Sequence, residues 1–596
     1  MILTDSDQWV KLFEALRLET RKSAEKHVHI YVSASDADST CALRILESMF
    51  QNEMIPHGWL PVSRYQEIVD DFMRAYDDED EVVRYIILLN CGASEDVGKI
   101  LDLGRRPNVC VIIFDSHRPV MHVANDNDPQ SQVYVIMDAE SEGISLEDIP
   151  FAFGEGMDED GHSPSYPENT DGMNVVEGDA SGGRGEKSSH AQSAAVRRAA
   201  YYQAGMHYGK PTSCVLYDLA YHLRQESSYF LWLAIVGLTD YLIHNKMPAS
   251  KYESYYVQYE NHVASAGHLD DPGEIQREDG LEEGATTSKP ICRIAREDDY
   301  RFGLVREWTL WDAMMNSPYV AARLQTYSEK GRERLEFLLA KIGIPLREAK
   351  SSFQFDMKPL YHRRLQEQLA LHGMSYNLGD CMFHSFQLQD GFNRCVMAVD
   401  IVHALSALLE CGSRKSETDG SSHIDRFWRC WNALSWSNDS KELRKGLELA
   451  KKLQTALVTD GGAVIAQRLY HNFRSFRVFD LSEHKLTNQN LLVHPVALQR
   501  MAEFLQEQYY HQSQTSKRKP VVLVAPKDES GRCLVVGFQV CAPGEGNKLG
   551  SAFVQAAEDV GAQSWHDLFD TSVMEIMAND VERFKAELLR IASEIL

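Results

Sequence analysis

The chain has no Cys-x-x-C pair, although eleven cysteines are scattered from Cys41 to Cys541 along its 596 residues. Zinc ribbons need closely spaced cysteine pairs, and a disulfide framework normally uses an even number of cysteines in a small secreted chain. Neither class fits, because this chain is long and its odd set of cysteines has no regular spacing. We therefore expect reduced thiols in an intracellular protein.

Long apolar runs are also missing. The longest, Phe230 to Leu238, is well short of the roughly 20 residues that a membrane-spanning helix requires. The first residues, Met1 to Gln8, contain neither a basic stretch nor an apolar core, so we expect no signal peptide there. Together these absences predict a soluble protein of the cytosol or nucleus.

Basic residues are scarce: 61 Lys and Arg stand against 87 Asp and Glu, which gives a formal net charge of -26. Residues 138–188 hold fourteen acidic and two basic residues, net -12, and residues 264–290 hold seven and two, net -5. Both segments are rich in Gly, Ser, Pro and acidic residues, so the sequence predicts disordered acidic insertions. The rest of the chain carries only -9, and the total charge therefore does not exclude DNA as a partner.

Short, continuous apolar runs recur in the first part of the chain. They predict strands at residues 28–32, 82–89, 109–114 and 133–137. Because the runs are continuous rather than alternating, we expect these strands to be buried on both faces of a parallel sheet. After the first strand, apolar residues spaced by 3, 4 and 7 positions predict a helix whose buried face comprises Ala42, Ile45, Leu46, Met49 and Phe50.

The rest of the chain divides into a helical part and a second α/β part. Helices are predicted at 212–224, 227–245, 319–327, 332–342, 358–371, 396–409 and 441–457. Near the end, strands are predicted at 521–525, 534–540 and 572–577, and helices at 549–560 and from Val581.

The chain is too long for one hydrophobic core, so several domains are expected. We predict an α/β domain in residues 1–137 that is completed by helices in 196–262. An acidic insertion at 138–195 and an acidic linker at 263–291 follow its two parts. A helical region at 292–440 and a smaller C-terminal α/β domain at 441–596 complete the chain.

Polar residues follow two of the predicted strands. Asp36 and Asp38 come after the first strand, Asp115 and His117 come after the third, and Asp240 lies in an apolar predicted helix. Ligands bind at the carboxyl ends of strands in open α/β sheets, which makes this set a candidate site. Carboxylate and imidazole groups suit hard divalent cations such as manganese or magnesium. Two such ions could activate a water and clamp a phosphoryl group.

Each of these groups also has a simpler structural interpretation. Asp36 and Asp38 could cap the helix that follows them, whose first N–H groups need acceptors. His117 could be a hydrogen-bonded core residue, and the carboxylates could pair with Arg118 or another cation.

These residues resemble the motifs of the DHH phosphoesterases, which include the bacterial single-strand exonuclease RecJ. The matching features are the D-x-D of Asp36 and Asp38, the D-x-H-x-P from Asp115 to Pro119, and the helix that carries Asp240. The resemblance implies an α/β fold: a RecJ-like DHH domain with a parallel sheet, a helical interdomain region, and a smaller C-terminal α/β domain of the DHHA1 type.

The chain departs from the DHH pattern at three ligand positions. Ala34 replaces an aspartate, Asn90 replaces the carboxylate that bridges both metals, and Ser116 replaces the first histidine of the name-giving motif. A neutral amide cannot offset the repulsion between two adjacent dications. The Gly-Gly-His phosphate-binding motif is also missing, and residues 546–550 are the nearest glycine-bearing stretch.

We therefore expect no catalytic residue, no cofactor and no bound metal. The positions of the lost metal site are interpreted as vestigial; they are Asp36, Asp38, Asn90, Asp115, His117 and Asp240.

This pattern of loss, with an acidic insertion after the fourth strand and a helical interdomain region, is similar to the eukaryotic cell division cycle protein forty-five family. The stretches that carry the similarity are 88–93, 114–120, 232–240, 319–323 and 446–452. The resemblance implies a non-catalytic nuclear subunit of the replicative DNA helicase, which acts in initiation and elongation of replication. Its partners would be the MCM ring, the GINS complex and single-stranded DNA.

Two other functions stay open. One is an active DHH-type single-strand nuclease that uses a residual divalent-metal site. The other is a DNA-binding module without helicase partners. Candidate DNA contacts lie in two basic stretches, Arg474 with Arg477, and Lys517 to Lys519 with Arg518 between them. The first stretch could stack on bases through its aromatic residues, although alternation of core and surface residues explains it as well; the second could be a solvated loop.

Overall fold

The computed structural model describes the chain except for residues 23–26, 77–82, 127, 129, 152–195, 266–291, 352–362, 366, 369–381, 391–393, 412–420, 435–440, 493, 514–517, 529, 541–544, 567–568 and 596. Of the predicted helix at 358–371, residues 363–365, 367 and 368 are described and are helical, and the rest lie outside the described residues. Of the predicted linker at 263–291, residues 263–265 belong to a helix and the rest lie outside the described residues. Among the residues described, no helix combines the length and apolarity needed to cross a bilayer.

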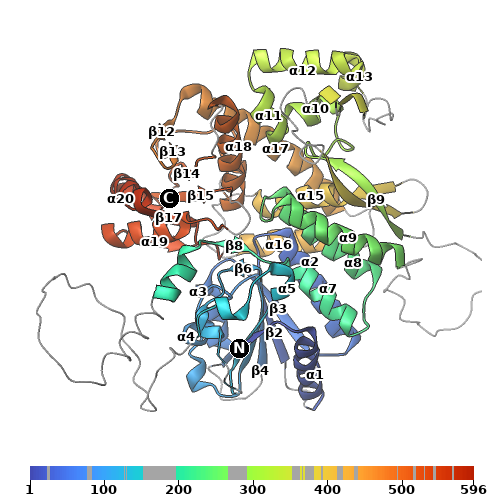
Figure 1. Cartoon of the computed structure of the whole chain (residues 1–596), viewed down its shortest axis with the longest axis vertical. Coiled ribbons are helices and arrows are strands. Elements are labelled where there is room, and N and C mark those ends of the chain that lie inside the picture. The colour runs from blue at the N-terminus through green and yellow to red at the C-terminus, as the bar shows by residue number, and fades with distance from the viewer. Residues whose placement is uncertain are drawn as a thin grey trace, which may run out of the picture.

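A six-stranded parallel sheet forms the centre of the first domain (Figure 1). Its strand order is β1 (Ile2–Leu3), β7 (Val133–Ile136), β5 (Cys110–Phe114), β4 (Val83–Leu89), β2 (His27–Ser33) and β3 (His57–Val62). Every pairing between neighbours is parallel. The four predicted strands are thus present, and the two short or less apolar strands β1 and β3 were not predicted.

Both faces of this sheet are buried, because successive side chains of each strand enter different cores. Ile30 and Val32 belong to one hydrophobic cluster, whereas Tyr31 between them belongs to another. Helices α1 (Ser6–Lys22), α2 (Ala37–Asn52), α7 (Thr212–His222) and α8 (Ser228–Ile243) cover the first face, and α3 (Tyr65–Tyr76) covers the second. The five residues predicted for the buried face of the first helix are all buried in α2.

Helix α8 is apolar on all sides, and every residue from Tyr229 to Leu242 is buried. It is followed by α9 (Ala249–Ser265). The prediction of a disordered insertion from Asp138 was wrong at its start, because α5 (Ala139–Glu142) and a 3-10 turn at Leu146–Asp148 are ordered. The reason is charge pairing: Asp138 lies 2.6 Å from the Lys210 ammonium, and Glu142 lies 2.7 Å from the Arg118 guanidinium. Residues 152–195 lie outside the described part of the chain.

The middle region contains a three-stranded antiparallel sheet that was not predicted. It comprises β9 (Cys292–Tyr300), β10 (Met382–Asp390) and β11 (Arg394–Met397). Tyr300 of β9 pairs with Met382 of β10, so this pairing is non-local and leaves no hairpin signal in the sequence, whereas β10 and β11 form a local antiparallel pair, with Asp390 opposite Arg394, that was also missed. The helices here are α10 (Leu310–Met315), α11 (Pro318–Leu324), α12 (Glu329–Ile342), α13 (Leu346–Ser351), α15 (Ala398–Glu410) and α16 (Ser421–Ala433).

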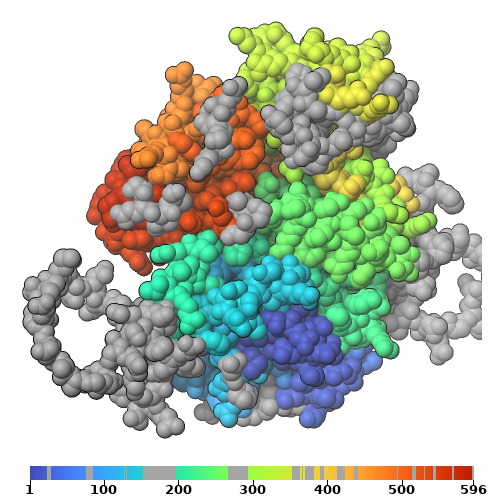
Figure 2. All heavy atoms as spheres, in the orientation of Figure 1, coloured from blue at the N-terminus to red at the C-terminus, as the bar shows by residue number. Residues whose placement is uncertain are grey.

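A second six-stranded sheet organises the C-terminal part. Its order is β12 (Tyr470–Asn472), β13 (Arg477–Asp480), β14 (Val521–Val524), β15 (Arg532–Phe538), β17 (Val573–Met577) and β16 (Ser564–His566). Helices α17 (Lys441–Gln467) and α18 (Pro495–Ser513) pack on one face, and α19 (Leu549–Val560) and α20 (Val581–Ile595) pack on the other. Figure 2 shows this part, in orange and red, seated above the first domain, in blue and cyan. The predicted fold class is confirmed.

Candidate functional site

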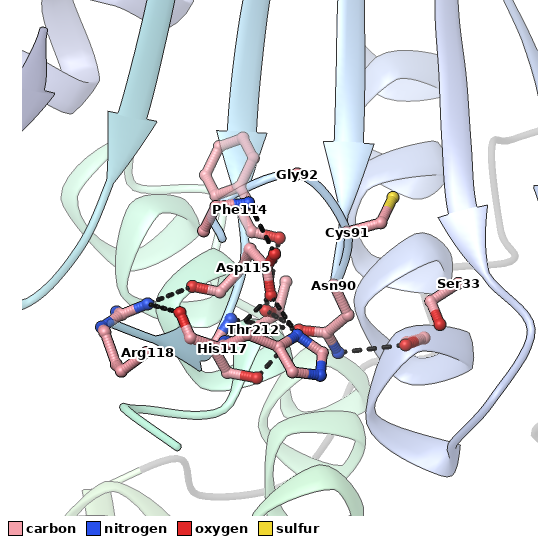
Figure 3. A network of polar contacts seen from close by, with 12 residues as sticks. Ser33, Asn90, Cys91, Gly92, Phe114, Asp115, His117, Arg118 and Thr212 are labelled. Atoms are coloured by element: carbon pink, nitrogen blue, oxygen red, sulfur yellow. Dashed lines mark hydrogen bonds and ion pairs between the residues drawn. The ribbon is translucent and has the colours of Figure 1, made fainter. Parts of the chain in front are cut away.

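The predicted site residues meet at the carboxyl edge of the first sheet. Asp36 follows β2. Asn90 follows β4 and Asp115 follows β5, as Figure 3 shows. Ala34 also lies at this edge, where its N–H donates to the carbonyl of Val62 at 2.9 Å. Asp240 comes from α8, which crosses the same region. The topology therefore brings together residues separated by up to about two hundred positions, as the parallel arrangement predicts.

Asp38 is completely buried and is surrounded by neutral donors. It accepts hydrogen bonds from the backbone N–H of Thr212 at 2.9 Å and of Ser213 at 3.0 Å, which are the first residues of α7. The amide of Asn90 donates to its second oxygen at 2.9 Å. Burial and the nearby Asp36 charge raise the pKa of Asp38. Its oxygens thus hold the start of α7, a helix 174 residues away in sequence.

Asp36 caps the helix that follows it. One oxygen accepts from the backbone N–H of Ser39 at 2.8 Å, as the capping interpretation predicts. Asp38 lies in the first turn of the same helix but caps α7 instead. The structure therefore separates the two carboxylates of the D-x-D pair into two different structural roles.

Asn90 has a positive φ of 51° and makes a neutral bridge at the centre of the site. Its amide donates to Asp38 and to the Ser39 hydroxyl, and its carbonyl accepts from the hydroxyl of Ser116 at 3.1 Å and of Thr212 at 2.5 Å. A carboxylate at position 90 could only accept hydrogen bonds. It would therefore lie as an anion against the Asp38 anion, and it could not donate to Asp38 as the Asn90 amide does. The neutral amide of Asn90 therefore supplies both donors and acceptors here and adds no negative charge to the site.

Asp115 and His117 form a buried pair (Figure 3). The His117 Nδ1 atom lies 2.6 Å from Asp115 Oδ1, and the other Asp115 oxygen accepts from the N–H of Ala93 at 2.9 Å. Burial alone would lower the pKa of His117, but the Asp115 charge outweighs it and raises that pKa. Burial likewise opposes ionisation of Asp115, yet His117 brings the pKa of Asp115 below its usual value.

Arg118 does not pair with the predicted acidic residues of the site. Its guanidinium contacts both oxygens of Glu142, at 2.8 and 2.7 Å, and donates to the carbonyl of Asp115 at 2.8 Å. It therefore ties α5 to the end of β5, and its charge is directed to Glu142 rather than to the D-x-D carboxylates.

The cation of this site is Lys246, which sequence reasoning missed. Its ammonium lies 3.0 Å from Asp36 Oδ2 and 2.9 Å from Asp240 Oδ2, and it sits 4.9 Å from the centre of the Tyr241 ring. Burial lowers the pKa of Lys246, but the two carboxylates reverse this and raise it well above its usual value. The sequence did contain a signal for this ion pair: Lys246 comes six residues after Asp240, an aspartate in an apolar helix that needs a partner when buried.

The two carboxylates that share Lys246 differ in acidity. Burial raises the pKa of both, but in Asp36 the Lys246 charge and the hydrogen bonds from Ser39 prevail and lower it. Asp240 has no such bonds: its Oδ1 atom accepts no hydrogen bond from any described residue, with His244 Nε2 at 3.4 Å, and its pKa is raised to about 6. We attribute the difference to these extra donors at Asp36.

This set of residues does not fit a divalent-metal pair. Asp38 is occupied by backbone donors, Asn90 is neutral, and the Lys246 ammonium lies between the two carboxylates that face each other. A dication at that point would be repelled by an ammonium at contact distance. Within the described residues, no group of three or more His, Cys, Asp or Glu side chains is arranged to hold a metal ion.

The two predicted DNA-binding stretches lie side by side in the C-terminal part. The Lys519 ammonium donates to the carbonyl of Phe473 at 2.8 Å, and β13 pairs with β14 immediately beyond. Arg477 is buried against Tyr509, whereas Arg518 contacts Glu507 at 2.6 Å. Arg474 is exposed, and Lys517 lies outside the described residues. The DNA-contact role of this edge stays a prediction.

Three comparisons relate the chain to known proteins. The sequence model of the CDC45 family matches residues 28–191 and 178–590. The human cell division control protein 45 homolog is 31% identical over 574 residues, which cover 94% of this chain and 96% of that protein. Cell division control protein 45 of Saccharomyces cerevisiae is 23% identical over 646 residues, covering 94% and 95%. The crystal structure of CDC45 from Entamoeba histolytica aligns over 100% of both chains, with 20% identity and a TM-score of 0.69, which shows a shared fold.

Proposed function

Because this chain belongs to the CDC45 family, as its match to the family over most of its length shows, we propose that it is a non-catalytic subunit of the eukaryotic replicative DNA helicase. Its relatives carry the name of cell division control proteins. In this proposal it acts in the nucleus with the MCM ring and the GINS complex, in initiation and elongation of DNA replication, and it contacts single-stranded DNA.

The observation that carries the non-catalytic part of the proposal is the position of Lys246. Its ammonium contacts Asp36 and Asp240 within 3.0 Å, where hydrolysis by metal-activated water would need a cation with open coordination positions. An ammonium carries only hydrogen-bond donors and cannot deliver a hydroxide. The vestigial carboxylates thus support packing of α2, α7 and α8 around the strand ends.

Recovery of the assembled complex tests the partnership. A tagged copy of the full chain, purified from its own cells in S phase, is expected to bring the MCM ring and the GINS complex with it. A matched culture held before S phase is the control for cell-cycle dependence. If neither complex is recovered while the tagged protein is intact, the proposed partnership is wrong.

A nuclease assay tests the competing function. Pure protein is incubated with Mn²⁺ and a labelled single-stranded oligonucleotide at high protein concentration, and no cleavage is expected. Asp38→Ala is the comparison variant, because any contaminating nuclease would cleave equally in both samples. Cleavage by the wild-type protein that disappears in Asp38→Ala would support an active phosphoesterase instead.

A further inference from the structure

A cavity of about 840 Å³ lies where the first domain, the middle helices and the C-terminal part meet. Its walls include the connection from α8 to α9, the end of α15, one side of α18 and the end of β15, which Figure 1 places around the centre of the molecule. Cavities of this size commonly hold small organic ligands. Lys246 lies at one side of it, but most of its lining does not belong to the vestigial site.

The charge of the lining favours a cationic ligand. Nine Asp or Glu residues and five Lys or Arg residues line the cavity. Several of the basic groups are already held by carboxylates, as Lys246 is by Asp36 and Asp240. A phosphate chain would meet an excess of carboxylates here, and its binding would be opposed by their field.

Glu410 is a buried carboxylate that lacks a donor. Its side chain is 1% exposed, and neither of its oxygens accepts a hydrogen bond from any described residue. The nearest cation is the Arg500 guanidinium, with Nη1 3.5 Å from Oε2. Glu410 is also the last residue of α15, where the helix dipole favours a positive charge. A buried carboxylate in this state is stabilised by an added N–H donor.

Glu503 provides a second carboxylate on the same wall. It lies one turn after Arg500 on α18, so the two side chains leave the helix on one face. The amide of Asn245 contacts one of its oxygens at 2.5 Å. Burial raises the pKa of Glu410 to about 7, against the lowering effect of Arg500, and burial together with Glu507 raises the pKa of Glu503 to about 7.

Apolar side chains separate the charged groups of the lining. Leu242 and Met247 contribute from the α8 end, Val496 contributes from α18, and Phe538 contributes from β15. A bare metal ion would leave this surface uncovered, and the described residues offer no ligand set for one. A ligand with two or more ammonium groups joined by methylene groups would match both the separated carboxylates and the apolar side chains of the lining.

We propose that this cavity binds a small aliphatic polyamine, with separate ammonium groups paired to Glu410 and Glu503 and the methylene chain lying against the apolar lining. Binding couples the three parts of the chain that form the walls. It therefore stabilises their arrangement by mass action, because the separated parts would not bind the ligand.

The test is calorimetric titration of the full-length protein with spermidine at pH 7 and physiological salt. One saturable site is expected, and about tenfold weaker binding is expected for Glu410→Gln and for Glu503→Gln, since each loses a charge-assisted pair. Glu558→Gln, at an exposed position on α19, is the matched control and should bind like the wild type. Thermal unfolding of each variant checks that it is folded. Glu410→Gln should fold, because it removes a buried charge and adds none.

Two further measurements separate this site from general attraction to an acidic chain. The titration is repeated in two buffers of different ionisation enthalpy, and the heats should differ, because Glu410 and Glu503 release protons when the ammonium groups bind. MgCl₂ at the same charge concentration should not displace spermidine from the saturable site. Equal binding by the wild type and both cavity variants, full displacement by Mg²⁺, or absence of a saturable site would overturn the proposal.

Discussion

Lys246 places its ammonium within 3.0 Å of Asp36 and Asp240, two carboxylates that are almost fully excluded from water. This fixed cation balances the charge of both carboxylates, which burial would otherwise make costly to ionise. An ammonium has only hydrogen-bond donors and no open coordination position, so it cannot activate a water as a metal ion does.

Lys246→Met should destabilise the protein strongly. Asp36 and Asp240 would remain buried without their cation, and breaking a buried ion pair from one side costs about 3–5 kcal/mol. The free energy of unfolding in urea measures the loss. Lys445→Met is the control, because Lys445 forms an ion pair at the surface and should change stability by less than about 1 kcal/mol. Equal losses in the two variants would contradict the assigned role of Lys246.

The Asp115–His117 pair predicts a pH dependence. The pKa of His117 is raised on folding, so its contribution is complete below its unfolded pKa and is lost as pH rises through the folded pKa. The pKa of Asp115 is lowered, so its contribution is present above the unfolded pKa and is lost as pH falls through the folded value. The pair therefore contributes most to stability at pH values between the unfolded pKa of Asp115 and the unfolded pKa of His117.

His117→Gln should remove the decline in stability that the wild type shows as pH rises above the unfolded value of about 6.5. Unfolding by urea at a series of pH values measures the difference between the two proteins. The other buried histidines contribute equally to both curves, so they cancel. A difference that stays constant across this range would show that His117 does not gain a proton through Asp115.

At the scale of elements, the contact between α8 and the start of α7 depends on a glycine. A Cβ atom on Gly237 would lie 2.1 Å from the Ser213 hydroxyl and 2.5 Å from Asp38 Oδ1. Both atoms belong to the hydrogen bonds that hold the start of α7 against α2. Helix α8 can approach this junction of α2 and α7 only because position 237 has no side chain.

Gly237→Ala should force α8 away from α7 and cost about 1–3 kcal/mol, the usual range for overpacking a core. Gly58→Ala in β3 is the control, since no atom lies within 4 Å of the added Cβ there. Its effect should stay within about 0.5 kcal/mol. The midpoints of chemical unfolding compare the two, and equal values would show that the α7–α8 contact adapts without cost.

Sequence patterns predicted the helices and strands whose own residues form a short apolar run or an apolar stripe. Strand β4 corresponds to the apolar run predicted at 82–89, and α12 corresponds to the helix predicted at 332–342, whose leucines and Ile342 are buried on one face. The edge strand β9 was missed because it is rich in charged residues and pairs with a strand that begins about eighty residues after it ends. Local periodicity carries no information on such a partner.

At the scale of the whole molecule, most of the negative charge lies in two acidic segments, residues 138–188 and 264–290, whereas basic residues gather at one edge of the C-terminal sheet. The net charge is -26, yet Arg474, Arg518 and Lys519 lie close together at one side of the C-terminal sheet. Two of these are partly engaged by neighbouring groups, and Arg474 is exposed. The edge is therefore the better candidate for DNA than the acidic central cavity.

Arg474→Ala should weaken binding of single-stranded DNA and reduce the slope of log K against log salt by about 1, since one phosphate contact is lost. Lys11→Ala, in an exposed basic position on α1, is the control and should leave the slope unchanged. Fluorescence anisotropy of a labelled oligonucleotide over a range of salt concentrations measures both. An unchanged slope for Arg474→Ala would place the DNA elsewhere.

The residues at the strand ends show where sequence reasoning stops. Asp36, Asp38, Asn90, Asp115, His117 and Asp240 were identified from motif order and strand position, and the sheet together with α8 does bring them to one edge. Their partners were not identified, because the hydrogen bond that the Thr212 N–H donates to Asp38 and the ion pair between Asp36 and Lys246 both depend on the packing of distant helices.

The amino-acid sequence by itself determined the family, the parallel sheet and the uncharged side chain at Asn90, since these depend on residue identity and short-range apolar pattern. Only the tertiary structure decided which cation pairs with Asp36 and Asp240. Helix α8 and its C-terminal connection must pack against α2 before the Lys246 ammonium can reach both carboxylates. The same packing closes the central cavity around Glu410, because its walls come from segments that are far apart in the chain.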